Sequence, residues 1–286
     1  MTDIPPLAPY PIPTGGRVLV FDSGVGGLTV AQEIMALAPD LAVDYSADTG
    51  FFPYGDKSDD ALRARIPAVA GALYEVVRPD VFVIACNTAS TLALPEVRAA
   101  LPCPVVGTVP AFKPAAQVSQ SGVIGLLATP GTIKRAYTDQ LIQSFASEAQ
   151  IIKHGSVELV KLAERHARGE EVPLSAFAEL QLPVFDAPGG DRIDTMVLAC
   201  THFPLVRDQL EQTAPRKVTY IDSGAAIARQ TLRLVPDGRE KQIGGRGYIT
   251  DDPKGREGLI ETLRRFGFAD VKSVEIAQPD SERAAS

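Results

Sequence analysis

Two of the three cysteines in this chain occupy the same point of the same short pattern. Cys86 follows the apolar run VFVIA and precedes Asn-Thr, and Cys200 follows TMVLA and precedes Thr-His. In a parallel sheet, ligands gather outside the carboxyl ends of the strands, so a residue directly after a buried strand faces such a site. Cys103 lies between prolines with no polar neighbour, which is typical of a cysteine that only packs. We therefore expect Cys86 and Cys200, but not Cys103, to line one cleft.

Two thiols on opposite sides of one substrate can carry a proton across the plane of a carbon atom. One sulfur removes the α-hydrogen of an amino acid as a base, and the other returns a proton to the opposite face as an acid. An unperturbed cysteine has a pKa of about 8.5, so each sulfur needs a neighbour that can take or hold its proton. Asp22, at the end of the first expected strand, and His202, two residues after Cys200, are the candidates. Alternatively, Asp22 is only a turn carboxylate, His202 only forms a structural hydrogen bond at a helix start, and the two cysteines form a redox disulfide.

The elements that must position these residues alternate along the chain. From about Arg17, short β-branched runs alternate with helical patterns, which predicts an α/β fold with mainly parallel sheets. The first unit reads as the strand RVLVF, the loop DSGVGG and a helix, and a later helix begins after Ser58 as its N-cap. Further on, the spacing of Ile133, Tyr137 and Leu141 predicts one helix.

The second half of the chain repeats features of the first. VIACNT and VLACTH overlay without gaps, and FDSG at 21–24 has an echo in IDSG at 221–224. This weak internal duplication predicts two pseudo-symmetric α/β domains with the site in the cleft between them. We expect a Pro-rich tail over 1–16, a first domain over 17–110 plus 222–286, and a second domain over 111–221.

The composition favours a small-molecule ligand. Of 286 residues, 45% are hydrophobic and 22% charged, which is typical of a folded globular protein. The net charge of −7 without a basic block argues against nucleic acid or an anionic membrane surface as a partner. The first residues lack the pattern of a signal peptide or membrane span. The three cysteines and three histidines lack zinc-ligand spacing, so we expect no metal, and unpaired thiols fit the cytosol.

Five motifs in order along the chain resemble those of the cofactor-independent glutamate racemases in the aspartate/glutamate racemase superfamily. They are FDSGVGGLTV at 21–30, DTGFFPYGDKS at 48–58, ACNTAS at 85–90, TPGTIKRAY at 129–137 and ACTHFPL at 199–205. The resemblance implies racemisation of L- and D-glutamate without pyridoxal phosphate or another cofactor, supplying D-glutamate for peptidoglycan. It also implies that Cys86 takes the proton from the D-isomer and Cys200 from the L-isomer, with Asp22 and His202 as auxiliary residues.

The same resemblance extends to the substrate contacts. Hydroxyls and backbone N–H groups can neutralise carboxylates, and glycine permits a close approach. The implied contacts are Ser23, Tyr54, Gly55, Asn87, Thr88, Thr132 and Thr201, and Asp48 and Glu164 match further acidic positions of the family site. Ser156 and Val157 stand where many relatives have Cys-Pro, so the match at Glu164 is the loosest, and the first 16 residues have no counterpart.

Other classes fit the motifs less well. The loop GVGG misses the third glycine of a dinucleotide-binding fingerprint, no P-loop lysine follows it, and no lysine stands in a motif typical of a Schiff base. A phosphatase with Asp22 as nucleophile would want a second acid at Gly24. Two alternatives stay open: a racemase that acts on aspartate, and a two-lobed amino-acid-binding protein that would not need the thiols. A homodimer also stays open.

Overall fold

The computed structural model describes residues 13–276 of the chain and builds them around two parallel sheets. The tail expected over 1–16 falls largely outside these residues. The first sheet has the strand order β10-β9-β2-β1-β3-β4 and the second has β6-β5-β7-β8. The strands of the first sheet are β1 (Arg17–Asp22), β2 (Ala42–Ala47), β3 (Val81–Ile84), β4 (Val105–Gly107), β9 (Arg246–Ile249) and β10 (Asp270–Ser273). The second sheet contains β5 (Val123–Ala128), β6 (Gln150–Gly155), β7 (Thr195–Ala199) and β8 (Thr219–Ile221).

Every strand pairing in both sheets is parallel, so the predicted α/β class is confirmed. The order β2-β1-β3-β4 in the first sheet recurs as β6-β5-β7-β8 in the second, which is the arrangement that the overlay of the two cysteine motifs predicts. The strands of the first sheet come from 17–107 and 246–273, and those of the second from 123–221. We accordingly propose the division into 17–110 plus 222–286 and 111–221 as domains.

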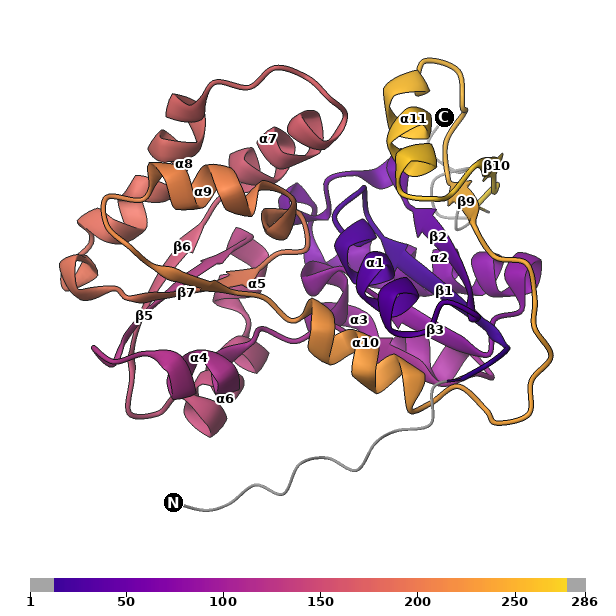
Figure 1. The fold of residues 1–286 in the computed structure, drawn as a ribbon, viewed down its shortest axis with the longest axis horizontal. Coiled ribbons are helices and arrows are strands. Elements are labelled where there is room, and N and C mark those ends of the chain that lie inside the picture. Colours follow the sequence, from indigo (N-terminus) through magenta and orange to yellow (C-terminus); the bar gives the residue numbers. More distant parts are fainter. Residues whose placement is uncertain (1–12, 277–286) are drawn as a thin grey trace.

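Helices cover both faces of each sheet (Figure 1). The first sheet is flanked by α1 (Leu28–Leu37), α2 (Asp59–Val77), α3 (Asn87–Ala100), α10 (Gly224–Leu232) and α11 (Glu257–Arg265). The second half carries α4 (Phe112–Val118), α5 (Pro130–Lys134), α6 (Ala136–Phe145), α7 (Val157–Ala167), α8 (Leu174–Asp186) and α9 (Arg207–Thr213). Short 3₁₀ turns are η1 (Thr49–Phe51), η2 (Tyr54–Asp56), η3 (Gly190–Arg192) and η4 (Phe203–Val206).

Burial on both faces explains why the central strands are apolar throughout. Along β1, Val18 and Val20 pack on one side of the sheet with α1 and α10, while Leu19 and Phe21 pack on the other with α2 and α3. Successive side chains of a strand point to opposite faces, so both sets must be apolar when helices cover both. These two cores hold the carboxyl ends of β1 and β3 rigidly in register.

Two local expectations have different outcomes. Ser58 caps α2 as predicted, because its hydroxyl accepts a hydrogen bond from the Ala61 N–H at 3.3 Å. The single helix predicted through Ile133 and Leu141 is wrong, because the chain leaves helical geometry at Arg135 and forms α5 and α6 instead. The Arg135 guanidinium donates to the Thr88 carbonyl and to other groups of the first half, and this contact between halves overrides local helix periodicity.

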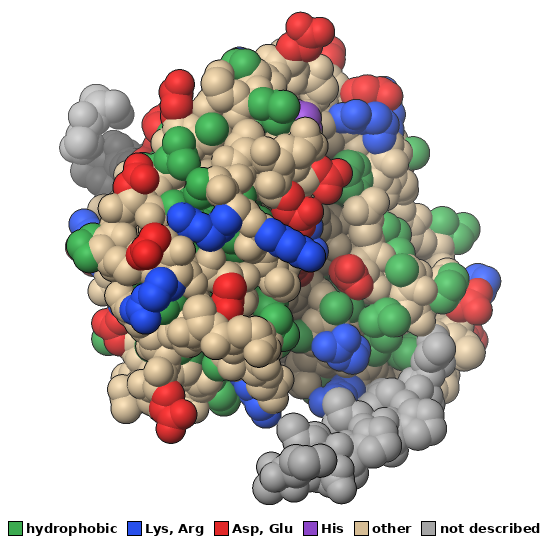
Figure 2. Space-filling view, turned by 60° about the vertical axis from the view of Figure 1, so that its left-hand side comes forward, with side chains coloured by type: hydrophobic (Ala, Val, Ile, Leu, Met, Phe, Trp, Pro, Cys, Tyr) green, Lys and Arg blue, Asp and Glu red, His purple; other side chains and the backbone are tan. Residues whose placement is uncertain are grey.

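The surface is mixed in charge. On the face shown in Figure 2, lysine and arginine side chains are interspersed with acidic ones, and neither sign covers a broad region. Within residues 13–276, none of the helices combines the length and the apolar character needed to cross a membrane.

Candidate active site

The carboxyl ends of β1, β2 and β3 bring three of the predicted residues to one edge of the first sheet. Asp22 is the last residue of β1, Asp48 follows β2, and Cys86 follows β3 after Ala85. The Asp48 N–H donates to the Asp22 carbonyl at 2.9 Å, and the Ala85 N–H donates to the Phe21 carbonyl at 2.8 Å. The parallel register therefore sets Asp22 between the starts of the two following loops.

Cys86 is buried and lies at the N-terminus of α3. Burial raises the pKa of its thiol most, and the negative charge of Asp22 raises it further. Backbone N–H groups of Ala89 and Thr88, in the first turn of α3, counteract this by stabilising the thiolate, but the net pKa is well above the ordinary value. Cys86 is therefore held as a thiol, with N–H groups in place for the thiolate it would become.

Cys200 lies directly after β7 and beside a buried ion pair. Its sulfur is 4.0 Å from Nδ1 of His202, and Nε2 of the same ring is 2.8 Å from Oε2 of Glu164. All three side chains are almost completely buried. The Val25 N–H of the glycine loop donates to the same Glu164 oxygen at 3.0 Å.

Glu164 and His202 fix each other's charge. Burial alone lowers the pKa of His202, but hydrogen bonds to Cys200 and Glu164 and the charges of Glu164 and Asp22 outweigh it and raise the pKa well above its ordinary value. Burial raises the pKa of Glu164, but the hydrogen bond to His202 and the positive charge of His202 outweigh burial, and the net pKa is lowered. The structure thus places the imidazolium of His202 beside Cys200 and the carboxylate of Asp22 near Cys86.

Asp22 joins the two halves of the molecule. Its carboxylate is fully buried and accepts a hydrogen bond from the Thr201 hydroxyl of the second half at 2.7 Å. Its other oxygen accepts from the Ser23 hydroxyl at 3.2 Å and the Gly24 N–H at 2.9 Å. A charge on Cys200 also raises the pKa of Cys86, which means that the two sulfurs lie within electrostatic reach of each other.

Hydroxyls from both halves meet beside the thiols. The Thr88 and Thr129 hydroxyls are 3.0 Å apart, and Thr129 bonds Thr132 at 3.0 Å. Nδ2 of Asn87 is buried and has no hydrogen-bond partner among residues 13–276. Asn87 lines a narrow cavity of about 10 Å³ together with Cys200 and Thr201. A buried amide without a partner is costly, so these donors suit the carboxylates of a ligand.

The predicted residues Asp48, Tyr54 and Gly55 contact other parts of the protein in this structure. The Tyr54 hydroxyl donates to Asp48 at 2.6 Å, and two nitrogens of Arg65 donate to the same carboxylate at 3.0 and 2.7 Å. Asp48 therefore anchors Tyr54 and Arg65 in this structure. A Cβ on Gly55 would lie 3.1 Å from the Thr129 side chain, so this glycine lets the two halves approach closely.

The loop DSGVGG packs directly on the ion pair. A Cβ on Gly24 would lie 2.7 Å from Oε2 of Glu164, and one on Gly26 would lie 2.4 Å from Nδ1 of His202. The Phe52 ring stacks at a tilt on His202, with 5.7 Å between ring centroids. Sequence reasoning did not name Val25, Phe52 or Thr129 as site residues, although each lies inside one of the five recognised motifs.

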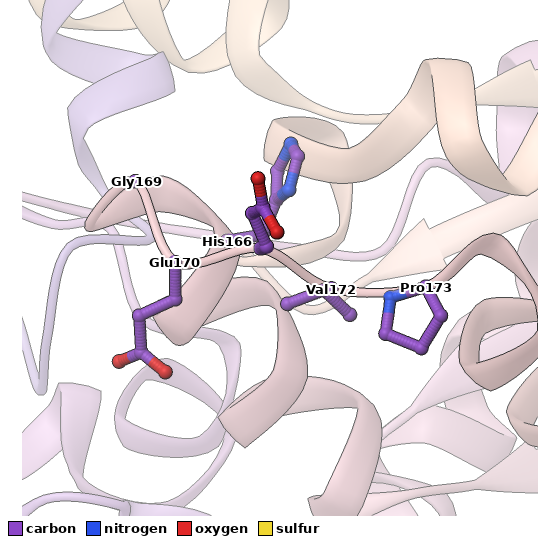
Figure 3. Close-up of a pocket in the computed structure, with 6 residues that line it drawn as sticks. His166, Gly169, Glu170, Val172 and Pro173 are labelled. Atoms are coloured by element: carbon purple, nitrogen blue, oxygen red, sulfur yellow. The ribbon is translucent and has the colours of Figure 1, made fainter.

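The structure thus brings together ten of the sequence-predicted site residues, most of them at or just after the ends of strands and Glu164 and Thr132 on helices. These are Asp22, Ser23, Cys86, Asn87, Thr88, Thr132, Glu164, Cys200, Thr201 and His202. No group of three or more His, Cys, Asp or Glu side chains in the described part of the chain could hold a metal ion. A separate open pocket of about 640 Å³ lies beyond α7, lined by His166 and 169–173, and includes none of the predicted residues (Figure 3).

Comparison with known proteins finds a family model and curated proteins that match most of the chain. The Asp/Glu/Hydantoin racemase family model matches residues 29–231. A glutamate racemase from Salmonella gallinarum is 45% identical over 276 residues, which cover 95% of this chain and 96% of that protein.

Two solved structures illustrate the likeness of the fold. The glutamate racemase of Escherichia coli, in complex with L-glutamate and the activator UDP-MurNAc-Ala, aligns with a TM-score of 0.86 at 43% identity, covering 92% of this chain and 100% of that one. The glutamate racemase of Thermus thermophilus, in complex with β-chloro-D-alanine, aligns with a TM-score of 0.70 at 27% identity, covering 92% and 98%.

Proposed function

Because this chain belongs to the Asp/Glu/Hydantoin racemase family, we propose that it interconverts L- and D-glutamate by moving the α-proton between Cys200 and Cys86. The activity is that of a glutamate racemase, an isomerase that works without pyridoxal phosphate and supplies D-glutamate for peptidoglycan. One observation supports the assignment of the two thiols above all others. Cys200 lies beside the imidazolium of His202, whereas Cys86 lies beside the carboxylate of Asp22.

This electrostatic asymmetry prepares the two sulfurs for opposite tasks. The imidazolium of His202 can donate a hydrogen bond to Cys200 while that sulfur acts as the base. An adjacent anion favours the thiol of Cys86, which is the form that can act as an acid. The resemblance assigns the α-proton of L-glutamate to Cys200 and that of D-glutamate to Cys86.

The reaction then needs one proton transfer on each face of the α-carbon. The Cys200 thiolate takes the α-proton, so the C–H bond breaks and an S–H bond forms. The Cys86 thiol returns its proton to the opposite face, so its S–H bond breaks and a new C–H bond forms. The N–H groups of Thr88 and Ala89 stabilise the resulting Cys86 thiolate. For D-glutamate the two sulfurs exchange roles.

Neutral donors suit the orientation of the substrate. Among the residues that line the narrow cavity at Cys200 there is no lysine or arginine. The amide of Asn87 and the hydroxyls of Thr88, Thr132 and Thr201 can bind carboxylates without placing a competing cation at the reacting carbon. We propose these residues, with Ser23, as the substrate contacts.

The experiment that tests the function follows the α-hydrogen. Purified protein in heavy water should abolish the optical rotation of L-glutamate while deuterium enters at the α-carbon, and D-glutamate should behave in the same way. Polarimetry and proton NMR measure the two processes. Hydroxylamine, which traps pyridoxal phosphate, should leave the rate unchanged, and aspartate should react far more slowly. Binding of glutamate without loss of rotation would favour the two-lobed binding protein instead.

The free thiols favour a reducing compartment for this protein. All three cysteines are free, and proton transfer between sulfurs requires that they stay reduced. We propose that the protein works in the cytosol on free glutamate. A homodimer remains a hypothesis.

We also propose that the chain binds an activator of the kind named for the E. coli structure, a nucleoside diphosphate sugar. A cavity of about 460 Å³ lies where the segments 106–114 and 221–230 pass between the halves, and the two thiols do not line it. Its wall includes the apolar Phe145 and the cations Lys113 and Arg229, a combination suited to a base or sugar and a diphosphate.

Adding UDP-MurNAc-Ala to the wild type should raise kcat/KM by about tenfold, in line with ordinary coupling energies between sites. The double variant Lys113→Ala, Arg229→Ala should keep the basal rate and lose most of the activation, measured as initial rates against activator concentration. Equal activation of both proteins would place the activator elsewhere.

A further inference from the structure

Glu164 uses both of its oxygens, one toward His202 and the other toward Arg168. Oε2 faces His202 and the Val25 N–H, as described above. Oε1 accepts a hydrogen bond from Nη2 of Arg168 at 2.7 Å. Glu164 lies in the last turn of α7 and Arg168 is the C-cap residue that follows the helix, so the two stand at i and i+4 with their side chains on one face. Glu164 is 3% exposed at its side chain and Arg168 is 25% exposed, so Arg168 closes the solvent side of the pair.

We propose that Arg168 is a positioning residue for the racemisation site: it fixes the outer oxygen of Glu164, and so holds His202 in line with Cys200. This inference rests on the proposed function. A carboxylate held at one oxygen only can rotate about its last bond. With Arg168 on Oε1, the position of Oε2 between the Val25 N–H and the His202 ring is determined. The ring in turn directs Nδ1 toward the sulfur of Cys200.

The turn that carries Arg168 is itself held by the other half of the molecule. The carbonyl of Ala167, the residue before it, accepts hydrogen bonds from the Thr262 hydroxyl at 3.2 Å and from Nη2 of Arg265 at 2.5 Å, both on α11. A Cβ on Gly258 would lie 4.0 Å from Cβ of Arg168, so the start of α11 lies over this residue. The outer anchor of Glu164 therefore lies where α7 of the second half meets α11 of the first.

Arg168 is one of two cations that stabilise the charge of Glu164. Burial raises the pKa of Tyr45 most, and the charges of Asp22, Glu164 and Cys86 raise it further, so Glu164 lies near other acidic groups. The cations that lower the pKa of Glu164 are His202 and Arg168. His202 contacts Cys200 through its other ring nitrogen, whereas Arg168 contacts the outer oxygen of Glu164 and can hold the carboxylate without taking part in proton transfer.

Arg168→Met tests this positioning. We expect kcat to fall by about tenfold with KM little changed, since a small misplacement of a group that supports the reaction mainly affects the chemical step. Arg168→Lys, which keeps a cation of similar reach, should recover most of the loss. The second readout is the Nε2–H proton of His202 in protein labelled with ¹⁵N-histidine. Its resonance should move upfield and exchange faster with water in Arg168→Met than in the wild type.

The chain offers a matched control on the same helix. Arg165 pairs with Glu170, and both side chains are about half exposed. Arg165→Met should leave kcat and the His202 resonance unchanged, and melting temperatures of all variants show that they are folded. A normal resonance and normal kcat in Arg168→Met would overturn the positioning role. The NMR readout does not require turnover, so a wild-type chain that fails to racemise glutamate would remove the proposed function separately.

Discussion

Replacing either Cys86 or Cys200 by serine is expected to stop racemisation while leaving a one-sided exchange reaction. A serine hydroxyl is far too weak an acid to supply the proton or to exist as the base, so kcat/KM should fall by about 10³-fold or more. The effect must be equal for both isomers, because enantiomers have equal free energies and the ratio of the two kcat/KM values is therefore one. Polarimetry with each isomer measures it.

Hydrogen exchange then identifies which sulfur serves which isomer. Cys86→Ser keeps the base assigned to L-glutamate, so it should exchange the α-hydrogen of L-glutamate with heavy water and leave its configuration intact. Cys200→Ser should do the same with D-glutamate. A reversed pattern would exchange the assigned roles of Cys86 and Cys200 and keep the two-base mechanism. Full racemisation in either variant would end that mechanism.

Cys103 provides the control for both substitutions. It is partly buried, packs against the core on the α2–α3 side of the first sheet and is chemically the same side chain. Cys103→Ser should retain full activity and lose about 1 kcal/mol of stability, since it replaces a small apolar group with a polar one. Loss of racemisation here would mean that cysteine replacement acts through folding and not through proton transfer.

The sequence was sufficient for the fold class and for the positions of the two sulfurs after strands, for one physical reason. Both depend on local patterns: strands buried on two faces must be apolar, and side chains that follow such strands collect at one edge of a parallel sheet. Cys86 and Cys200 each satisfy this rule independently. Their predicted positions therefore required no knowledge of how the two halves pack.

The partners of the sulfurs depend on packing between distant segments and were harder to predict. Glu164 lies on α7, 38 residues before His202, and was the loosest match in the sequence. The contact is made only when α7 packs against η4, for which no local pattern exists. Asp48 shows the converse: the sequence places it near the site, but its carboxylate is taken by Tyr54 and Arg65.

The glycine loop shows a third limit. Its residues read as ordinary turn chemistry, yet Gly26 has no left-handed backbone angle that would require glycine. What excludes a side chain is the approach of His202 from the other half. A requirement of this kind is invisible in the sequence and is directly testable.

Gly26→Ala is expected to disable the site by moving His202. The new Cβ would lie 2.4 Å from Nδ1, 2.8 Å from Cε1 and 2.8 Å from the backbone nitrogen of His202. Non-bonded carbon and nitrogen atoms need about 3.5 Å, so the loop or the histidine must shift by about 1 Å. The ring stands between Glu164 and Phe52, and either shift weakens its contact with Cys200. We expect kcat to fall by about 10²-fold, measured by polarimetry.

The stability of the same variant separates this steric effect from misfolding. Overpacking at a buried contact costs about 1–3 kcal/mol, which leaves a domain of this size folded, so urea denaturation should show a moderate loss with a cooperative transition. Gly71→Ala is the matched control, because no heavy atom of the described chain, beyond its neighbours and helix backbone, lies within 4 Å of a Cβ added in α2. It should gain about 0.5–1 kcal/mol and keep full kcat. A wild-type rate in Gly26→Ala would mean that the position of the His202 ring does not limit proton transfer at Cys200.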